Sequence, residues 1–194
     1  MKNFNKIVIL NTSKYILITI LFLNFSCTTI TKSQNNNTKS KKVTAKDILG
    51  NPNYQAICYG GYREKTRDIQ PTISQLKEDL KILSAMQIKI VRTYNVHLKH
   101  ASNVLLAISE LKKENPDFEM YVMLGAWIDC KNAWTEFPVI HHEESERNAV
   151  EIEEAVRLAN LYPDIVKVIA VGNEAMIKWA TSYYVEPHII LKWV

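Results

Sequence analysis

The ten residues 165–174, Ile-Val-Lys-Val-Ile-Ala-Val-Gly-Asn-Glu, constrain the fold of this chain more than any other part of its sequence. Residues 165–171 of this run are apolar, and mostly β-branched, apart from Lys167. Strands covered on both faces read as near-continuous apolar runs, whereas half-exposed strands alternate apolar and polar residues. The run therefore predicts a buried parallel strand that ends in Asn173 and Glu174, at the end of the strand where α/β barrels keep their functional groups.

Strand-like and helical patterns alternate from residue 54 to the C-terminus, which predicts a parallel sheet. The predicted strands cover residues 54–61, 88–94, 119–126 and 165–174. The first helix begins at Pro71-Thr72 with Thr72 and Gln75 as a capping box. The later helices have apolar faces at Ala101, Val104, Leu105, Ile108 and Leu111, then at Ala149, Ile152, Val156 and Ala159, and a last helix begins at Pro187. Residues 127–142 and 175–186 are predicted to be long loops.

Four β-then-α units are half of a (β/α)8 barrel, which typically needs about 250 residues. Residues 47–194 supply only a little over half of that length. We therefore predict an α/β fold that is the N-terminal half of such a barrel, with parallel strands. The alternative is a four-stranded doubly wound sheet, but that fold would normally show short β–α loops and a glycine-rich phosphate turn, which the sequence lacks.

The N-terminus is typical of an export signal. Residues 1–26 contain three lysines, no acidic residue and an apolar stretch at 15–25 that is too short to cross a bilayer comfortably. Leu23-Asn-Phe-Ser-Cys27 resembles a bacterial lipoprotein processing site, in which Cys27 becomes the lipidated N-terminus, although Asn24 stands where an aliphatic residue is usual. An ordinary secreted chain cleaved nearby is the alternative. We expect an exported protein, either lipid-anchored to the membrane at the cell envelope or secreted, with residues 27–46 as a disordered polar tether.

Charge and composition argue against a nucleic-acid partner. Three of the 24 basic residues and none of the 20 acidic ones precede residue 27, so the rest of the chain has a formal charge of only +1. The remaining basic residues are dispersed among acidic residues along helical faces.

Metal and disulfide chemistry are not expected either, and no cofactor is predicted. His141-His142-Glu143-Glu144 suggests a metal site, but adjacent histidines cannot share one helix face, so these residues are interpreted as a solvated helix start. Cys58 and Cys130, if they lie on first and third strands, would be about 9 to 10 Å apart, which is too far for a disulfide.

The ends of the predicted strands carry the groups that suggest a function. They read Cys58-Tyr59-Gly60, Arg92-Thr-Tyr94, Gly125-Ala-Trp127-Ile-Asp129 and Gly172-Asn173-Glu174. In this order the chain resembles glycoside hydrolase family 17, the retaining β-1,3-glucanases and related transglycosylases, continuously over residues 54–194. The run Trp179-Ala-Thr-Ser-Tyr-Tyr-Val also resembles the loop after the acid in bacterial members.

The resemblance implies that Glu174 is the proton donor and that Asn173 binds the sugar 2-hydroxyl. Cleaving an acetal requires protonating a poor leaving-group oxygen, and apolar surroundings at a strand end would favour the protonated carboxyl. The alternative is a structural carboxylate paired with Arg92. A retaining mechanism also needs a second carboxyl as nucleophile; in the family this is a Glu at the end of the seventh strand, which the sequence does not contain.

The other strand-end residues are expected to bind substrate. Arg92 would position the catalytic carboxylates, Tyr59 and Tyr94 would contact sugar, and Trp127 would stack on a pyranose ring. Asp129 is the second acid expected near the cleft. Each of the aromatic residues could instead be a packed core residue, and Trp134 and Trp179 could extend the cleft or cover the barrel rim.

We therefore expect a β-glucan hydrolase fragment that binds β-glucan polysaccharide or oligosaccharide and is inactive alone because it lacks the nucleophile. Its first and fourth strands would be unpaired edges. Two alternatives remain: a surface β-glucan-binding module without catalysis, and a half-barrel that completes itself as a homodimer or with the missing half.

Overall fold

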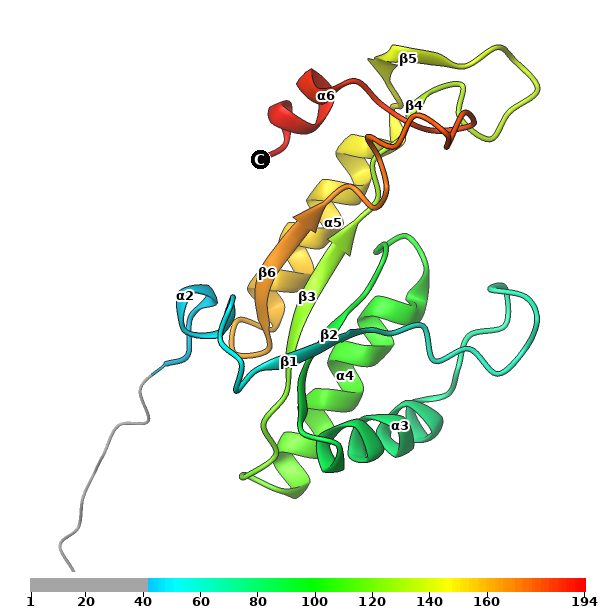
Figure 1. Cartoon of the computed structure of the whole chain (residues 1–194). Coiled ribbons are helices and arrows are strands. Elements are labelled where there is room, and N and C mark those ends of the chain that lie inside the picture. Colours follow the sequence, from blue (N-terminus) through cyan, green and yellow to red (C-terminus); the bar gives the residue numbers. More distant parts are fainter. Residues whose placement is uncertain (1–41) are drawn as a thin grey trace, which may run out of the picture. The chain divides into compact units, whose positions relative to one another are not determined.

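The computed structural model of the chain describes residues 42–194 (Figure 1). The predicted signal segment 1–26, the predicted lipidation residue Cys27 and the tether up to residue 41 lie outside the described residues. Within residues 42–194, every helix is too short or too polar to span a membrane.

A short helix, α2 (Ala45–Ile48), begins ahead of the domain boundary expected at residue 47. The Asp47 carboxylate accepts a hydrogen bond from the Thr44 backbone N–H over 2.9 Å, which caps the helix start. Ile48 is 2% exposed and packs with Ile90 and Tyr121 of the sheet. Val43, near the end of the predicted tether, packs with the same residues, so the chain is already ordered here, ahead of residue 47.

The main sheet has four parallel strands, as predicted. They are β1 (Gln55–Cys58), β2 (Ile88–Arg92), β3 (Tyr121–Ala126) and β6 (Val166–Val171), in the order β1-β2-β3-β6. β1 and β6 are the edges of the sheet, and β1 is exposed along its whole length.

The helices between the strands are α3 (Ile73–Ala85), α4 (Lys99–Glu114) and α5 (Arg147–Leu161), and α6 (Pro187–Lys192) follows β6. The predicted capping box of α3 is confirmed. The Gln75 N–H donates to Thr72 Oγ1 over 3.2 Å, and the Thr72 N–H donates to Gln75 Oε1 over 2.9 Å. Satisfying both groups fixes where this helix begins.

Helices α3, α4 and α5 cover one face of the sheet (Figure 1). On this face the core joins Leu76 and Leu80 of α3 and Leu105 of α4 to Val91 and Val122 of the sheet. Burying each such side chain contributes roughly 1.5–3 kcal/mol. The core therefore fixes the central strands β2 and β3, whose C-terminal ends carry the predicted site.

The predicted apolar face of α5 is confirmed in part, because Ile152 and Ala159 pack against the core but Val156 does not. The residues of α5 that are fully buried are Asn148, Glu151, Ala155 and Leu158, whereas Val156 is 46% exposed. The physical reason is that α5 uses its first two turns to hydrogen-bond the strand ends through polar side chains. Apolar periodicity alone does not report such contacts.

The loop predicted at residues 127–142 contains a hairpin, and the predicted helix start at His141–Glu144 is wrong. β4 (Cys130–Lys131) and β5 (Ile140–Glu144) pair antiparallel, and α5 begins only at Arg147. A segment distant in sequence supports β5, because the Glu186 N–H donates to the His141 carbonyl over 3.0 Å and the Tyr184 ring stacks on His141 with centroids 3.6 Å apart.

Candidate functional site

The C-terminal ends of β1, β2 and β6 bring Cys58, Arg92, Tyr94 and Asn173 together, a group we call the strand-end cluster. Arg92 Nη2 donates to Asn173 Oδ1 over 3.0 Å, and Arg92 Nη1 lies 3.8 Å from Cys58 Sγ. The Arg92 guanidinium lies 5.9 Å from the centroid of the Tyr94 ring. Arg92 is thus the centre of the cluster and holds the Asn173 side chain in one orientation.

Asn173 and Glu174 point in different directions because the backbone turns sharply after β6. Gly172 has φ 80° and Glu174 has φ 52°, both in the left-handed region. This conformation is uncommon for a residue other than glycine, and such strain is concentrated at functional sites. As a result Asn173 is 8% exposed, whereas Glu174 is exposed to solvent.

Glu174 contacts Tyr183 and not Arg92. The Tyr183 hydroxyl donates to Glu174 Oε2 over 3.3 Å. The structural ion pair considered for Arg92 and Glu174 is replaced by the bond from Arg92 to Asn173. The apolar surroundings expected for Glu174 are not formed by the described part of the chain, since this side chain is exposed.

Trp127, Trp134 and Tyr183 form an aromatic cluster beside Glu174. The ring centroids of Trp127 and Tyr183 are 5.2 Å apart, and Trp134 stacks on Tyr183 at 5.0 Å with an interplanar angle of 21°. Burial raises the pKa of the Tyr183 hydroxyl, and the negative charge of Glu174 and the hydrogen bond to it act in the same direction. Tyr183 therefore stays a hydrogen-bond donor to Glu174 at neutral pH.

The structure does not bring Tyr59 to the strand-end cluster. Successive residues of a strand point to opposite faces, so Tyr59 faces the helices while Cys58 faces the cluster. The Tyr59 ring is 8% exposed, and its hydroxyl donates to Asp79 Oδ2 of α3 over 2.7 Å. Tyr59 is therefore a packed core residue whose hydroxyl is hydrogen-bonded, which is the alternative considered for it from the sequence.

Asp129 is a buried, paired carboxylate. Its side chain is 3% exposed and accepts from Arg147 Nη2 over 2.9 Å. Burial raises the pKa of Asp129 above its ordinary value, and the Arg147 guanidinium opposes this effect only in part. Its backbone N–H and carbonyl are bonded to Asn148, so Asp129 is fixed to the start of α5.

Glu151 of α5 organises the site but was not identified from the sequence. Its carboxylate accepts backbone N–H groups of Val96 over 2.6 Å, Trp127 over 2.9 Å and His97 over 3.1 Å. It therefore ties the loop after β2 to the residue that follows β3. One sequence signal could have identified it: Glu151 stands four positions before Ala155, so both lie on the same face of α5, and an acidic residue on a buried face needs hydrogen-bond partners.

Gly125 allows β2 and β3 to approach closely just below these residues. A Cβ at this position would meet the Thr93 carbonyl oxygen at 2.4 Å, and the Gly125 N–H donates to Thr93 Oγ1 over 3.1 Å. Glycine has no Cβ, so it permits this approach. The close approach sets the spacing between Tyr94 and Trp127.

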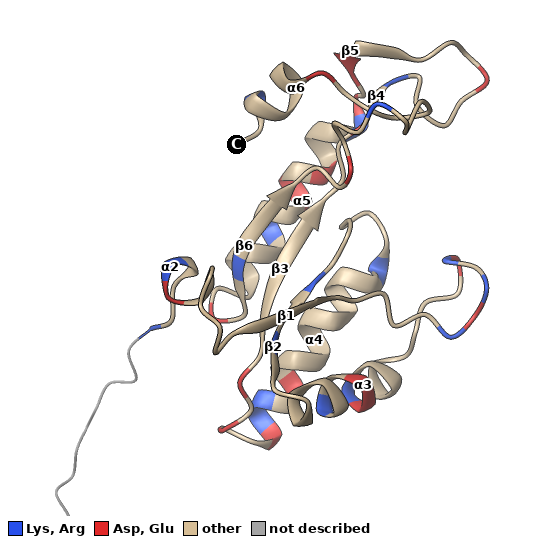
Figure 2. Ribbon diagram, viewed as in Figure 1, with Lys and Arg blue, Asp and Glu red and all other residues tan. Residues whose placement is uncertain are grey.

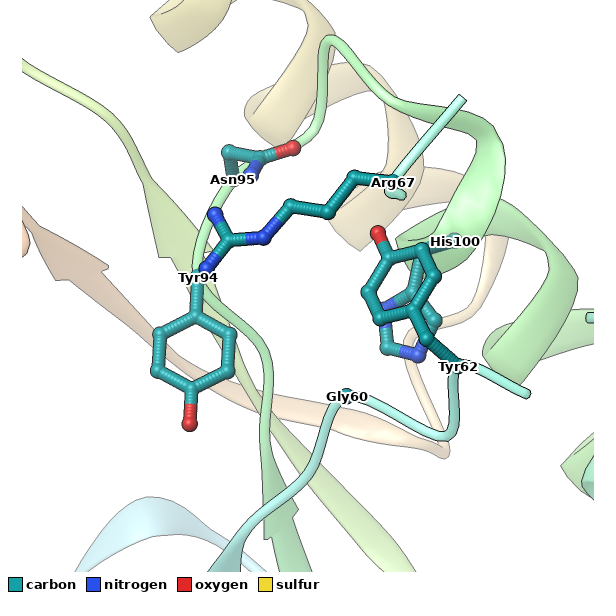
Figure 3. Close-up of a pocket in the computed structure, with 6 residues that line it drawn as sticks. All are labelled: Gly60, Tyr62, Arg67, Tyr94, Asn95 and His100. Atoms are coloured by element: carbon teal, nitrogen blue, oxygen red, sulfur yellow. The ribbon is translucent and has the colours of Figure 1, made fainter. Parts of the chain in front are cut away.

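A small cavity of about 70 Å³ lies at the ends of β1 and β2, beside the strand-end cluster (Figure 3). The Arg67 guanidinium reaches toward Tyr94 and Asn95, and the Tyr62 ring stacks on the His100 imidazole with centroids 5.2 Å apart. His100 Nε2 is buried and has no hydrogen-bond partner. Burial lowers the pKa of His100 to about 4, so its ring is neutral at pH 7.

Cys58 and Cys130 are both free thiols. Among the side chains of residues 42–194, no group of three or more His, Cys, Asp or Glu is arranged to hold a metal ion.

A comparison with solved structures found a protein that is similar to this chain. The match is the crystal structure of an endo-laminarinase from Formosa Hel1_33_131, with a TM-score of 0.77 and 70% sequence identity over 78% of this chain. The chain spans 38% of the length of that enzyme. No protein-family model and no curated protein matches the sequence. The fold and sequence of this chain are therefore similar to those of one part of that enzyme.

Proposed function

We propose that this chain is the acid-bearing part of a β-1,3-glucan hydrolase of the family 17 type, with Glu174 as its proton donor. The 70% identity to an endo-laminarinase is the observation that carries this proposal, because it extends over most of the chain. The position of Asn173-Glu174 at the end of β6, beside an arginine and an aromatic cluster, agrees with it.

The proposed fold of the complete protein is a (β/α)8 barrel of which this chain forms the N-terminal half. Three features support it: the parallel strands follow one another in chain order, β1 and β6 are free edges, and the three long helices cover a single face of the sheet. In a complete barrel the other face would enclose the core and the edges would pair with further strands.

In the proposed reaction, Glu174 transfers its proton to the glycosidic oxygen. The bond from that oxygen to the sugar C1 breaks, and its electron pair remains on the oxygen. A second carboxylate attacks C1 from the opposite face and forms a glycosyl–enzyme intermediate, which water then hydrolyses with retention of configuration. The buried Asp129 is paired with Arg147 and is not available for this role, so we assign the nucleophile to a segment outside this chain.

Two side chains prepare this step. Asn173, held by Arg92, would hydrogen-bond the sugar 2-hydroxyl, a contact that strengthens as the ring approaches an oxocarbenium ion. Tyr183 would keep the Glu174 carboxyl in place through its hydroxyl. Both side chains are bound before substrate arrives, so little reorganisation is needed in the transition state.

We also propose export and lipid anchoring at Cys27. This part of the proposal is supported only by the sequence of residues 1–27. Metabolic labelling with a radioactive fatty acid would test it, because Cys27→Ser should abolish the label.

Fragment complementation tests the catalytic proposal. The chain is mixed with a fragment of the endo-laminarinase that begins where its match to this chain ends, and release of reducing sugar from laminarin is measured. We expect no release by the chain alone, release by the mixture, and loss of at least about 100-fold of that activity with Glu174→Gln. Glu64→Gln, at an exposed loop position, is the matched control. Full activity with Glu174→Gln would show that Glu174 is not the acid.

A further inference from the structure

A wide groove lies between the N-terminal ends of α4 and α5, and its tryptophan wall packs against Tyr183, which is hydrogen-bonded to Glu174. Its volume is about 980 Å³, near the upper end of the range of about 300–1,000 Å³ that ligand sites usually have. Trp127 and Trp134 lie on one side, Val150 and Glu154 of α5 on another, and the loop after β2 closes the third. Glu174, Asn173 and Arg92 do not line this groove.

The two tryptophans give the groove an aromatic wall. Their ring centroids are 6.3 Å apart and the rings are tilted by 45°. Trp134 is 57% exposed, and its φ of 61° is in the left-handed region, where a bulky residue is a genuine outlier. Both rings also interact with the Asp129 carboxylate and lower its pKa, although burial raises that pKa by more. The exposed indole is therefore held in place at a conformational cost, which is typical of a binding surface.

The charges around the groove favour a neutral ligand. Basic and acidic side chains both line it, and α5 carries residues of both signs along its length (Figure 2). Asp129 pairs with Arg147, and backbone N–H groups bind the Glu151 carboxylate. A polyanion or a polycation gains no net attraction there. The charged lining residues are Arg67, Lys99 and Arg147, with Asp68, Asp129, Glu151 and Glu154.

Aromatic faces combined with planar polar side chains suit a polyhydroxylated ligand, because one face of a pyranose is apolar while its hydroxyl groups point outward. A β-1,3-linked chain turns at each linkage, so successive rings face in different directions and match tilted platforms better than coplanar ones. The ligand class that fits the groove is thus a β-1,3-glucan.

All walls of the groove belong to this chain. They are attached to β2 and β3, the two central strands, and to α4 and α5. None of the residues that line the groove lies on β1 or β6, the edge strands of the described sheet. The groove can therefore be tested in this chain separately from catalysis.

We propose that the groove between α4 and α5 binds a second stretch of β-1,3-glucan, apart from the stretch that is cleaved at Glu174. The inference rests on the proposed function for the identity of the polysaccharide. Its role is to retain the polymer while the cleft works on another segment. Trp134 is the main platform, and Tyr183 lies between the two tryptophan rings and Glu174.

The test is a calorimetric titration of the full chain with laminarihexaose, the β-1,3-linked glucose hexamer, and with cellohexaose, its β-1,4-linked counterpart. Val150→Arg places a long side chain in the groove, and Val156→Arg, on the same helix but away from the groove, is the matched control. Both valines are exposed, at 68% and 46%, so neither change disturbs the core. Circular dichroism would verify that each variant is folded.

We expect laminarihexaose to bind more tightly than cellohexaose. Val150→Arg and Trp134→Ala should each raise the Kd for laminarihexaose about tenfold or more, while Val156→Arg and Glu174→Gln leave it unchanged. Absence of binding to the unmodified chain, or an unchanged Kd with Val150→Arg, would overturn the proposal. Weaker binding with Glu174→Gln would also overturn it, because the ligand would then occupy the cleft. Complementation with Glu174→Gln reports on the catalytic proposal alone, so the two can fail separately.

Discussion

Replacing His100 by Phe should remove a pH-dependent part of the stability of this domain. The His100 ring is 4% exposed, stacks on Tyr62 and lies 5.6 Å from the Tyr59 ring. Its Nε2 has no partner that would stabilise a proton there. Burial therefore lowers the pKa of His100 in the folded state from 6.5 to about 4. Phenylalanine keeps the stacking and has no group that titrates.

The sign follows from which state binds the proton. Between pH 6.5 and pH 4 the unfolded chain protonates His100 and the folded protein does not, so acid stabilises the unfolded state. The stability that depends on neutral His100 is fully present above pH 6.5 and is lost as the pH falls toward 4. The loss approaches 1.36 kcal/mol per pH unit and reaches about 2.5 kcal/mol at pH 4.5.

Urea unfolding followed by tryptophan fluorescence measures this effect. The free energy of unfolding is compared at pH 7.5 and pH 4.5 in the unmodified protein, in His100→Phe and in His142→Gln, a histidine whose side chain is 67% exposed. The decrease on acidification should be about 2.5 kcal/mol smaller in His100→Phe and unchanged in the control. An equal decrease in all three proteins would show that His100 titrates normally in the folded state.

Two further predictions concern how the strand ends are held. Glu151→Gln should lower the free energy of unfolding by about 2–3 kcal/mol, because the amide keeps one acceptor oxygen for Val96 and Trp127 but turns its NH₂ group toward the His97 N–H and loses the negative charge. The exposed Glu153→Gln on α5 should change this free energy by less than about 0.5 kcal/mol. Equal losses of stability in the two variants would show that Glu151 does not hold the strand ends. Gly125→Ala should lower the free energy of unfolding by about 3 kcal/mol or more, since its Cβ would collide with the Thr93 carbonyl oxygen. Gly50→Ala is the control: its Cβ would meet open space, so only the left-handed φ of 71° should matter, and the loss in the same urea assay should be about 1 kcal/mol.

The sequence determined the order and type of the main elements. The apolar runs of the four parallel strands and the capping box at Thr72 and Gln75 are local signals, and each was found where it was predicted. The residues at the strand ends follow from the same reasoning, because parallel strands carry their C-terminal residues to one edge of a sheet. Arg92 and Asn173 could therefore be placed together from the sequence, and the structure joins them by a hydrogen bond.

Contacts between distant segments could not be read in this way. The hairpin at residues 130–144 is supported by residues 184–186, and the buried face of α5 is set by the backbone groups that Glu151 binds. Local patterns do not show these partners, since they depend on which loops meet in space.

For the site, the sequence determined which residues reach the edge of the sheet, and only the tertiary structure decided where each side chain points. Strand alternation sends Tyr59 to the helices, although its neighbour Cys58 faces the cluster. The left-handed turn at Gly172 and Glu174 separates Asn173 from Glu174, which are neighbours in the chain. The pairing of Tyr183 with Glu174 and the groove beside Trp134 arise from loops that pack on one another, and that packing is a property of the fold as a whole.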